Sequence, residues 1–249
     1  MELNTRNSEG WQIPSAPLRA SSVTPALIGL AAVVALATSA RAALPLGDRY
    51  PLKASLLFVA IMGLSIGFLQ RHHPFPRFGA ANQATTLRAI LVALVAALVG
   101  EAPAPPLASA AVAVTLSATL LDGVDGWLAR RERIASAFGA RFDMEIDALL
   151  ILALSVLVWR YGKAGGWVVA SGLLRYVFVV GGALAPWLRG ALPASRRRQT
   201  ICIVQIAALT VAMLPAVQPP TSALCAAAAL AALGYSFLVD TVWLWQHAA

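Results

Sequence analysis

Four aspartates at helical spacing are the residues in this sequence best suited to chemistry. Asp122 and Asp125 lie three residues apart, and Asp143 and Asp147 lie four apart, so each pair shares one face of a helix. The chain has eleven acidic residues, and six of them fall between positions 122 and 147. Converging carboxylates repel one another, and a hard divalent cation with oxygen ligands relieves that repulsion. The spacing therefore predicts a Mg²⁺ or Mn²⁺ site.

The residues around the two pairs suit a flat, phosphate-bearing ligand. Gly126 and Gly139 each lie four residues from an aspartate of the cluster, and Ala129 continues the first of the two helices. Small side chains beside metal-bound carboxylates let a bulky ligand approach the backbone. Arg130 closes the run, where a guanidinium could hold a phosphate. Helix packing in a membrane also favours glycines, and that alternative is compatible with ligand binding.

The composition indicates that membrane helices position these residues. Of 249 residues, 59% are apolar and only 12% are charged, roughly half the charged fraction of a soluble domain. This argues against a soluble domain, a disordered chain or a nucleic-acid-binding protein, and places the net charge of +8 at a lipid surface. Both cysteines lie in apolar runs, which argues against a disulfide scaffold or a cysteine zinc site.

Eight apolar segments are long enough to cross a bilayer, which takes about 20 residues. Proline and glycine mark most of the joins between them. The segments are 24–44, 52–70, 84–101, 107–129, 143–161, 165–187, 200–217 and 222–246. We therefore predict an all-α integral membrane protein with about eight transmembrane helices. Arg88 makes the third segment the weakest, and we expect its side chain to reach the interface from the helix end.

Lysine and arginine counts predict the orientation of these helices. The side that carries the 130–142 loop has eleven of these residues and the opposite side has five, so the first side is expected to be cytoplasmic. Eight spans then put both termini and the aspartates on that side. The polar stretch 71–83 predicts a boundary. It separates 1–75, with a cytoplasmic N-terminus and two leading helices, from a six-helix unit at 76–249.

The run from Asp122 to Asp147 resembles the signature of the CDP-alcohol phosphatidyltransferase family. It reads LDGVDGWLARRERIASAFGARFDMEID and carries the eight fixed positions of the signature at family spacing. These positions are Asp122, Asp125, Gly126, Ala129, Arg130, Gly139, Asp143 and Asp147. A preceding segment with Asn82, Thr85 and Arg88 is similar to the family's first-helix motif. The resemblance spans roughly 76–217, and the last helix fits the family's six-helix catalytic core.

The resemblance implies a metal-dependent transferase of phospholipid biosynthesis. The donor would be a CDP-activated lipid, expected to be CDP-diacylglycerol, the acceptor a small alcohol, and the leaving group CMP. Two Mg²⁺ or Mn²⁺ ions would bind Asp122, Asp125, Asp143 and Asp147, and Asp147 would also act as the base. The expected donor contacts are Asn82, Thr85, Gly126, Ala129, Arg130 and Gly139. Family members are often dimeric, so a homodimer is expected.

The acceptor stays open at this point, with glycerol 3-phosphate, serine, inositol phosphate and choline as alternatives. Many family members carry a lysine where this chain has Ala148, and a glutamine three residues after a threonine where Gln205 lies five residues after Thr200. Arg175 lies in the middle of an apolar segment. It is expected either to bind the acceptor or to pair with Asp240, because intramembrane arginines usually face a cavity or a partner.

Several other readings apply to the charged residues. Arg196 and the two arginines after it either attract an anionic acceptor or lipid, or only mark the cytoplasmic side. Glu145 lies on the far side of its helix from Asp143, about 200° round, and is expected to face an arginine. The aspartates could belong instead to an intramembrane prenyltransferase or a divalent-metal transporter. The two aspartate motifs of a prenyltransferase usually lie far apart in sequence, so the 18 residues between Asp125 and Asp143 argue against that enzyme. A transporter would place its carboxylates near the membrane midplane, which argues against the second alternative.

Overall fold

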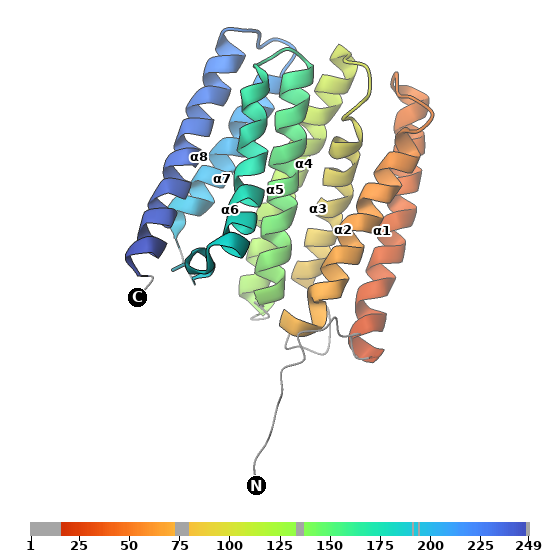
Figure 1. Cartoon of the computed structure of the whole chain (residues 1–249). Coiled ribbons are helices and arrows are strands. Elements are labelled where there is room, and N and C mark those ends of the chain that lie inside the picture. Colours follow the sequence, from red (N-terminus) through yellow and green to blue (C-terminus); the bar gives the residue numbers. More distant parts are fainter. Residues whose placement is uncertain (1–15, 73–79, 133–136, 191, 194, 248–249) are drawn as a thin grey trace.

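The protein is a bundle of α-helices in the computed structural model, which describes residues 16–72, 80–132, 137–190, 192–193 and 195–247 (Figure 1). Within these residues there are eight α-helices, two short 3₁₀ helices and no strand. The α-helices are α1 (Ala16–Ala43), α2 (Tyr50–His72), α3 (Ala80–Ala97), α4 (Pro105–Glu132), α5 (Ala137–Arg160), α6 (Ala170–Leu184), α7 (Arg196–Met213) and α8 (Thr221–Gln246). The predicted all-α class is confirmed, and each predicted segment overlaps one α-helix, with bounds that differ by up to eight residues.

Four stretches of these helices are long and apolar enough to cross a membrane. They are Ser21–Ala43, Pro105–Gly123, Gly166–Leu184 and Thr221–Gln246. Large apolar side chains point outward along them, such as Leu27, Leu120, Leu184 and Leu224, which are 62–84% exposed. Outward-facing apolar side chains along whole helices fit a lipid environment. The expected total of eight transmembrane spans stays a prediction.

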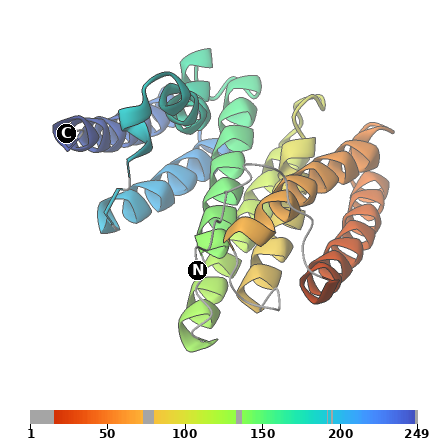
Figure 2. The ribbon, with the colours of Figure 1, turned by 60° about the horizontal axis from the view of Figure 1, so that its bottom comes forward.

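Four helices form a ring at the centre of the bundle. α3 packs against α4, α4 against α7, α7 against α5, and α5 against α3. α1 and α2 pack on the α3 side, whereas α6 and α8 pack against α5 and α7 (Figures 1 and 2). Leu150, Leu154 and Leu157 of α5 are at most 1% exposed, as are Leu209 and Met213 of α7. All five belong to one buried hydrophobic cluster, and the packing of α5 on α7 within it holds the ring.

A glycine allows α5 and α6 to approach closely. A Cβ atom added at Gly172 of α6 would lie 2.4 Å from the Cα atom of Leu152 on α5. No side chain fits at that distance, so α6 can lie against α5 only because residue 172 is a glycine. This contact fixes the position of α6 and therefore of Arg175, which lies one turn further along the same helix.

Besides the packing of α1 and α2 on α3, a polar attachment joins the leading helices to Glu101, which lies after α3. The Gly47 amide donates to Glu101 Oε2 at 2.8 Å, and Lys53 of α2 forms an ion pair with Oε1. Burial alone would raise the pKa of Glu101, but the bonds from Lys53 and Gly47 outweigh burial and hold the pKa below its ordinary value. The attachment is therefore strongest above the pKa of an unfolded glutamate, about 4.3. It weakens as pH falls through the lower folded-state pKa.

We expect Gly172→Ala to lower the apparent Tm of the purified protein in detergent. The added methyl group must displace the α5 backbone, and such overpacking costs about 1–3 kcal/mol. Gly234→Ala on α8 is the matched control, because a Cβ there meets no atom within 4 Å. Thermal unfolding followed by intrinsic fluorescence measures both variants. Equal Tm values for the two would show that the α5–α6 contact tolerates a side chain.

Candidate active site

Arg88 of α3 joins acidic side chains from two other helices. Its Nη1 atom lies 2.8 Å from Oδ1 of Asp122 on α4 and also pairs with Oδ1 of Asp143 on α5. Its Nη2 atom pairs with Oδ1 of Asp147, one turn further along α5. The Arg88 side chain is only 2% exposed. A guanidinium this deeply buried is tolerated because several carboxylates surround it, and it reduces their mutual repulsion.

The three described aspartates are close enough to share a metal ion. Asp122, Asp143 and Asp147 each offer one carboxylate oxygen, and these oxygens lie within 4.8 Å of one another. Oxygen ligands lie about 2.0–2.6 Å from Mg²⁺ or Ca²⁺, so one ion fits between oxygens at this separation. A set of carboxylate oxygens selects hard divalent cations such as Mg²⁺ and Mn²⁺. The donor chemistry therefore fits the expected cofactor.

Part of the sequence motif lies outside the described side chains. The positions concerned are Asp125, Gly126, Ala129 and Arg130, whose backbone belongs to α4. Gly139 is described and half-buried, one turn before Asp143 on α5. Asn82 and Thr85 of α3 are each 4% exposed and precede Arg88 by six and three residues. They therefore lie on the α3 side of the aspartate cluster.

Cys202 of α7 adds a contact from a fourth helix. Its Sγ–H donates to Oδ2 of Asp147 at 3.6 Å. Arg88 already holds Oδ1 of the same carboxylate, so both oxygens of Asp147 are engaged and its orientation is fixed. Arg88 and Cys202 are the contacts that sequence reasoning missed. The expectation that Arg88 reaches the interface is wrong, because the carboxylates draw its guanidinium into the ring.

The remaining charges near this end form two further clusters. Arg175 of α6 pairs with Glu145 of α5 through Nη2, and its Nε donates to Oε2 at 3.3 Å. Asp240 of α8 instead pairs with Arg197 and, at 3.2 Å, with Arg198. The alternative of an Arg175–Asp240 pair is therefore wrong, because Glu145 pairs with Arg175 while Arg197 and Arg198 pair with Asp240. The expectation that Glu145 faces an arginine is confirmed.

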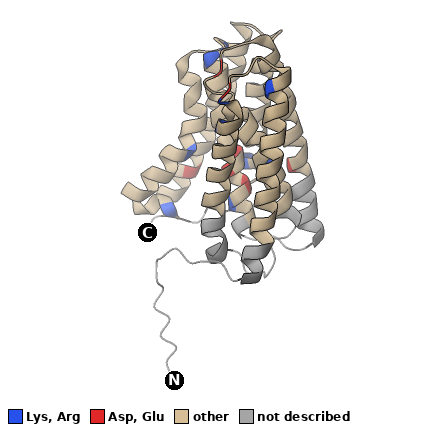
Figure 3. Ribbon diagram, turned by 90° about the vertical axis from the view of Figure 1, so that its right-hand side faces the viewer, with Lys and Arg blue, Asp and Glu red and all other residues tan. Residues whose placement is uncertain are grey.

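Figure 3 shows acidic and basic positions inside the bundle around mid-height, and further ones at the end opposite the C-terminus. Arg196, at the start of α7, is exposed. Among the described side chains, no acidic group pairs with Arg196, in contrast to Arg197 and Arg198 beside it. Its guanidinium therefore keeps its donors for another anion.

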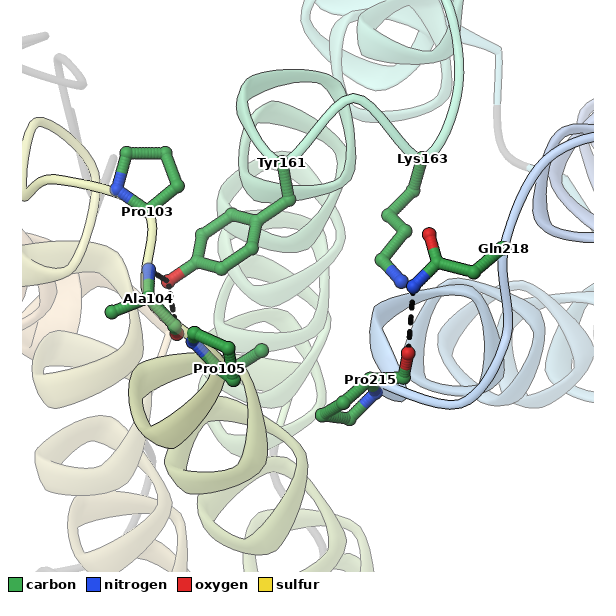
Figure 4. Close-up of a pocket in the computed structure, with 8 residues that line it drawn as sticks. Pro103, Ala104, Pro105, Tyr161, Lys163, Pro215 and Gln218 are labelled. Carbon is green, nitrogen blue, oxygen red and sulfur yellow. Dashed lines mark hydrogen bonds between the residues drawn. The ribbon is translucent and has the colours of Figure 1, made fainter.

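A small pocket lies at the opposite end of the bundle (Figure 4). It measures about 190 Å³ and is lined by Pro103, Ala104, Pro105, Ala108, Tyr161, Lys163, Pro215 and Gln218. The Lys163 ammonium donates to the carbonyls of Leu214 at 3.2 Å and Val217 at 2.6 Å, just after α7. The Lys163 ammonium is thus hydrogen-bonded to backbone carbonyls at the end of α7, as basic side chains often are at helix ends. We therefore attribute this pocket to the packing of helix ends. Asp147 lies about 20 Å further along α5 from this end.

Comparison with known proteins decides the family. Residues 78–240 match the model of the family described as CDP-alcohol phosphatidyltransferase. The chain belongs to this family. The match contains all the described aspartates of the cluster, together with Arg88 and Cys202. CDP-alcohol phosphatidyltransferases are enzymes, so the protein is a transferase of this class, and its apolar helices make it a multi-pass membrane protein.

Two curated relatives support a role in phospholipid synthesis. Both are named "Probable phosphatidylglycerophosphate synthase" and come from Mycobacterium tuberculosis, one from strain CDC 1551 / Oshkosh and one from strain H37Rv. Each is 32% identical to this chain over 137 residues, which cover 54% of this chain and 66% of the relative. No solved structure matches the chain.

Family membership disfavours the prenyltransferase and transporter readings of the aspartates. It also accounts for their arrangement, because CDP-alcohol phosphatidyltransferases generally require a divalent metal and three of the aspartates converge. α1 and α2 lie before the matched residues. The division of the chain into 1–75 and a six-helix core at 76–249 stays a prediction.

We expect Arg88→Gln to be strongly destabilising in the presence of EDTA. Removing the buried cation leaves the aspartates uncompensated, and breaking a buried ion pair costs about 3–5 kcal/mol. A second change, Asp147→Asn, should not lower the Tm of this variant further, because it removes one of the uncompensated charges. Apparent Tm in detergent measures both effects.

The matched control for this measurement is Arg196→Gln, which removes an exposed arginine without a described ionic partner. Its Tm should stay within about one degree of the wild type, in keeping with a surface substitution. If Arg88→Gln were as stable as this control, the guanidinium would not be what balances the cluster.

Proposed function

We propose that the protein transfers the phosphatidyl group of CDP-diacylglycerol to glycerol 3-phosphate and releases CMP. The observation that carries this proposal is the convergence of carboxylates from α4 and α5 within 4.8 Å, inside the residues that match the family. The names of the two mycobacterial relatives support glycerol 3-phosphate among the possible acceptors. A product with a phosphorylated headgroup also fits the basic residues at this end of the bundle.

In this proposal the four aspartates hold two divalent ions, Mg²⁺ or Mn²⁺. Asp122, Asp143 and Asp147 are the described ligands, and Asp125 is the fourth. The ions would offset the negative charge of the diphosphate and polarise the phosphorus under attack. Arg88 keeps the carboxylates turned toward a common point, because it contacts all three that are described.

The chemical step exchanges the phosphoanhydride bond of the CDP diphosphate for a phosphoester bond to the acceptor. A bond forms between the acceptor hydroxyl oxygen and the phosphorus of the phosphatidyl group, and the bond from that phosphorus to CMP breaks, with its electron pair leaving on CMP. The hydroxyl is a poor nucleophile until it loses its proton. Asp147 accepts that proton, and Cys202 and Arg88 hold its carboxylate in one orientation for the transfer.

The donor nucleotide would lie against the cytoplasmic ends of α3, α4 and α5. Asn82 and Thr85 offer buried polar side chains there. Gly126, Ala129 and Gly139 leave room for the cytidine and ribose, and Arg130 binds the diphosphate. The acyl chains would remain among the exposed apolar side chains of the bundle.

Two arginines are proposed for the acceptor. Arg196 has free donors at the start of α7, and a guanidinium binds a phosphate through two parallel hydrogen bonds. Arg175 is the second, although Glu145 occupies its Nε and Nη2 atoms. Its Nη1 atom donates to the sulfur of Met144 at 2.8 Å, which is a weak acceptor. An acceptor phosphate would be a stronger partner for that atom.

The proposed orientation places the active site and both termini in the cytoplasm. α1 begins and α8 ends at the same end of the bundle (Figure 1), and the aspartates lie toward that end on α4 and α5. The excess of arginine and lysine on this side supports the assignment. We also propose a homodimer, in line with the family resemblance.

An assay of CMP release tests this proposal. Purified protein is supplied with CDP-diacylglycerol, glycerol 3-phosphate and Mg²⁺ or Mn²⁺, and product lipid is identified by mass. We expect CMP and phosphatidylglycerophosphate in equal amounts, and no release in EDTA. No CMP release with this acceptor at any metal concentration would overturn the proposed function.

We expect Asp147→Asn to lose turnover by about 10²-fold or more, because a proton acceptor of this kind contributes at least that factor. CDP-diacylglycerol affinity should change only a few-fold, since the other aspartates remain. Asp48→Asn is the matched control, because Asp48 pairs with Arg41 at the far end of the bundle. Near-normal turnover in Asp147→Asn would eliminate this residue as the base.

A further inference from the structure

Two polar side chains inside the helix ring lack hydrogen-bond partners. Thr115 of α4 and Gln205 of α7 are both 0% exposed. In the part of the chain that the structure describes, no group bonds to the Thr115 hydroxyl or to either atom of the Gln205 carboxamide. Buried polar groups are nearly always satisfied, because an unsatisfied one carries a desolvation penalty of about 1–3 kcal/mol. A polar partner is therefore expected at this position.

Both side chains point toward the interior of the ring. Thr115 precedes Asp122 by seven residues, which is two turns and brings the side chain to nearly the same direction. Asp122 points inward, since it pairs with Arg88 across the ring. Gln205 follows Cys202 by three residues on α7, and Cys202 points inward to Asp147. The two unsatisfied groups thus extend the walls that carry the aspartate cluster.

Thr115 and Gln205 also lie at similar depth. Pro105 of α4, Tyr161 after α5 and Pro215 after α7 line one pocket and so mark a common level. Along the helix axis, Thr115 lies about 15 Å from the start of α4, and Gln205 lies about 12 Å from the end of α7. Both of these helix ends are at the level of the pocket. Asp147 lies about 20 Å in on α5. The two groups therefore lie about 5–8 Å nearer to the pocket end than the proposed base, which places them beyond Asp147 as seen from the aspartate end of the ring.

The chemistry of these groups selects an uncharged ligand. A carboxamide offers both a donor and an acceptor, and a threonine hydroxyl does the same. α5 presents Leu150 and Leu154 at these depths, and both are at most 1% exposed. A hydroxyl group satisfies donor and acceptor together without bringing charge into this apolar surrounding.

We propose that Thr115 and Gln205 form a binding site for a hydroxyl group of the acceptor, separate from the hydroxyl that attacks phosphorus. The inference rests on the proposed function and deepens it, because it makes Gln205 a specificity-determining residue for polyol acceptors. With glycerol 3-phosphate, the ligand is the secondary hydroxyl. An ordered water offers the same chemistry, and the experiment below separates the two sources.

The test compares glycerol 3-phosphate with 3-hydroxypropyl phosphate, which lacks only the secondary hydroxyl. For the wild type we expect kcat/KM to favour glycerol 3-phosphate about tenfold or more, because a site built to bind a hydroxyl rejects the analogue without it. In Gln205→Met this preference should fall to about one, and in Thr115→Val by about threefold or more. The donor KM should change less than twofold in each variant.

Thr210→Val is the matched control, since Thr210 is a buried threonine of α7 whose hydroxyl donates to the Ile206 carbonyl at 2.7 Å. It should keep the wild-type preference. If Gln205→Met does not fold, Thr115→Val and the wild-type preference still decide the matter, and a wild-type preference near one overturns the inference.

An unchanged preference in both variants, with a lowered Tm, assigns the site to an ordered water and also overturns the inference. Neither result affects the proposed function, which stands while the wild type releases CMP with glycerol 3-phosphate. If the wild type releases none, the proposed function fails and this inference fails with it.

Discussion

The Arg88 guanidinium and the carboxylates around it form the interaction on which the rest of the site depends. One cation from α3 reaches Asp122 on α4 and two aspartates one turn apart on α5. Brought together without it, these carboxylates would repel one another in a region of low dielectric. With it, they hold their oxygens within a few ångströms of each other, as a divalent ion requires. The ring of α3, α4, α7 and α5 supplies the geometry, and the hydrophobic core in which α5 packs on α7 holds it.

Every acidic side chain that the structure describes forms an ion pair with a lysine or an arginine. Glu101 pairs with Lys53, Glu145 with Arg175, Asp240 with Arg197 and Arg198, and Asp48 with Arg41. Glu101 and Asp240, whose side chains are only 10% exposed, depend most on such a partner, because burial of a lone charge is strongly unfavourable. Arg196 differs from Arg197 and Arg198 beside it, which both pair with Asp240, and this difference recommends it for binding a phosphorylated acceptor.

Sequence reasoning could predict those features that depend on a single helix. The length of the apolar segments predicted the eight helices, and the spacing of Asp143 and Asp147 placed both on one face of α5. The same arithmetic turned Glu145 away from the aspartates and toward an arginine, as the structure confirms. The aspartates could also be expected to converge, because consecutive helices carry them at similar depth.

Features that depend on which helices pack together could not be predicted in this way. Arg88 was expected at the interface, since nothing in its own segment shows that α3 lies beside α4 and α5. Asp240 was a candidate partner for Arg175. Because α8 packs on α7, Asp240 instead forms ion pairs with Arg197 and Arg198. Cys202 lies in an apolar run of the sequence, and only the position of α7 beside Asp147 gives it a role.

The most direct test of this account is a Mn²⁺ titration of the purified protein followed by electron paramagnetic resonance. We expect the wild type to remove free Mn²⁺ from solution, and Asp143→Asn to bind it much more weakly, because a charged oxygen ligand is lost. Asp48→Asn should bind as the wild type does. Mn²⁺ binding by Asp143→Asn that matched the wild type would contradict the claim that the carboxylates gathered around Arg88 form the metal site.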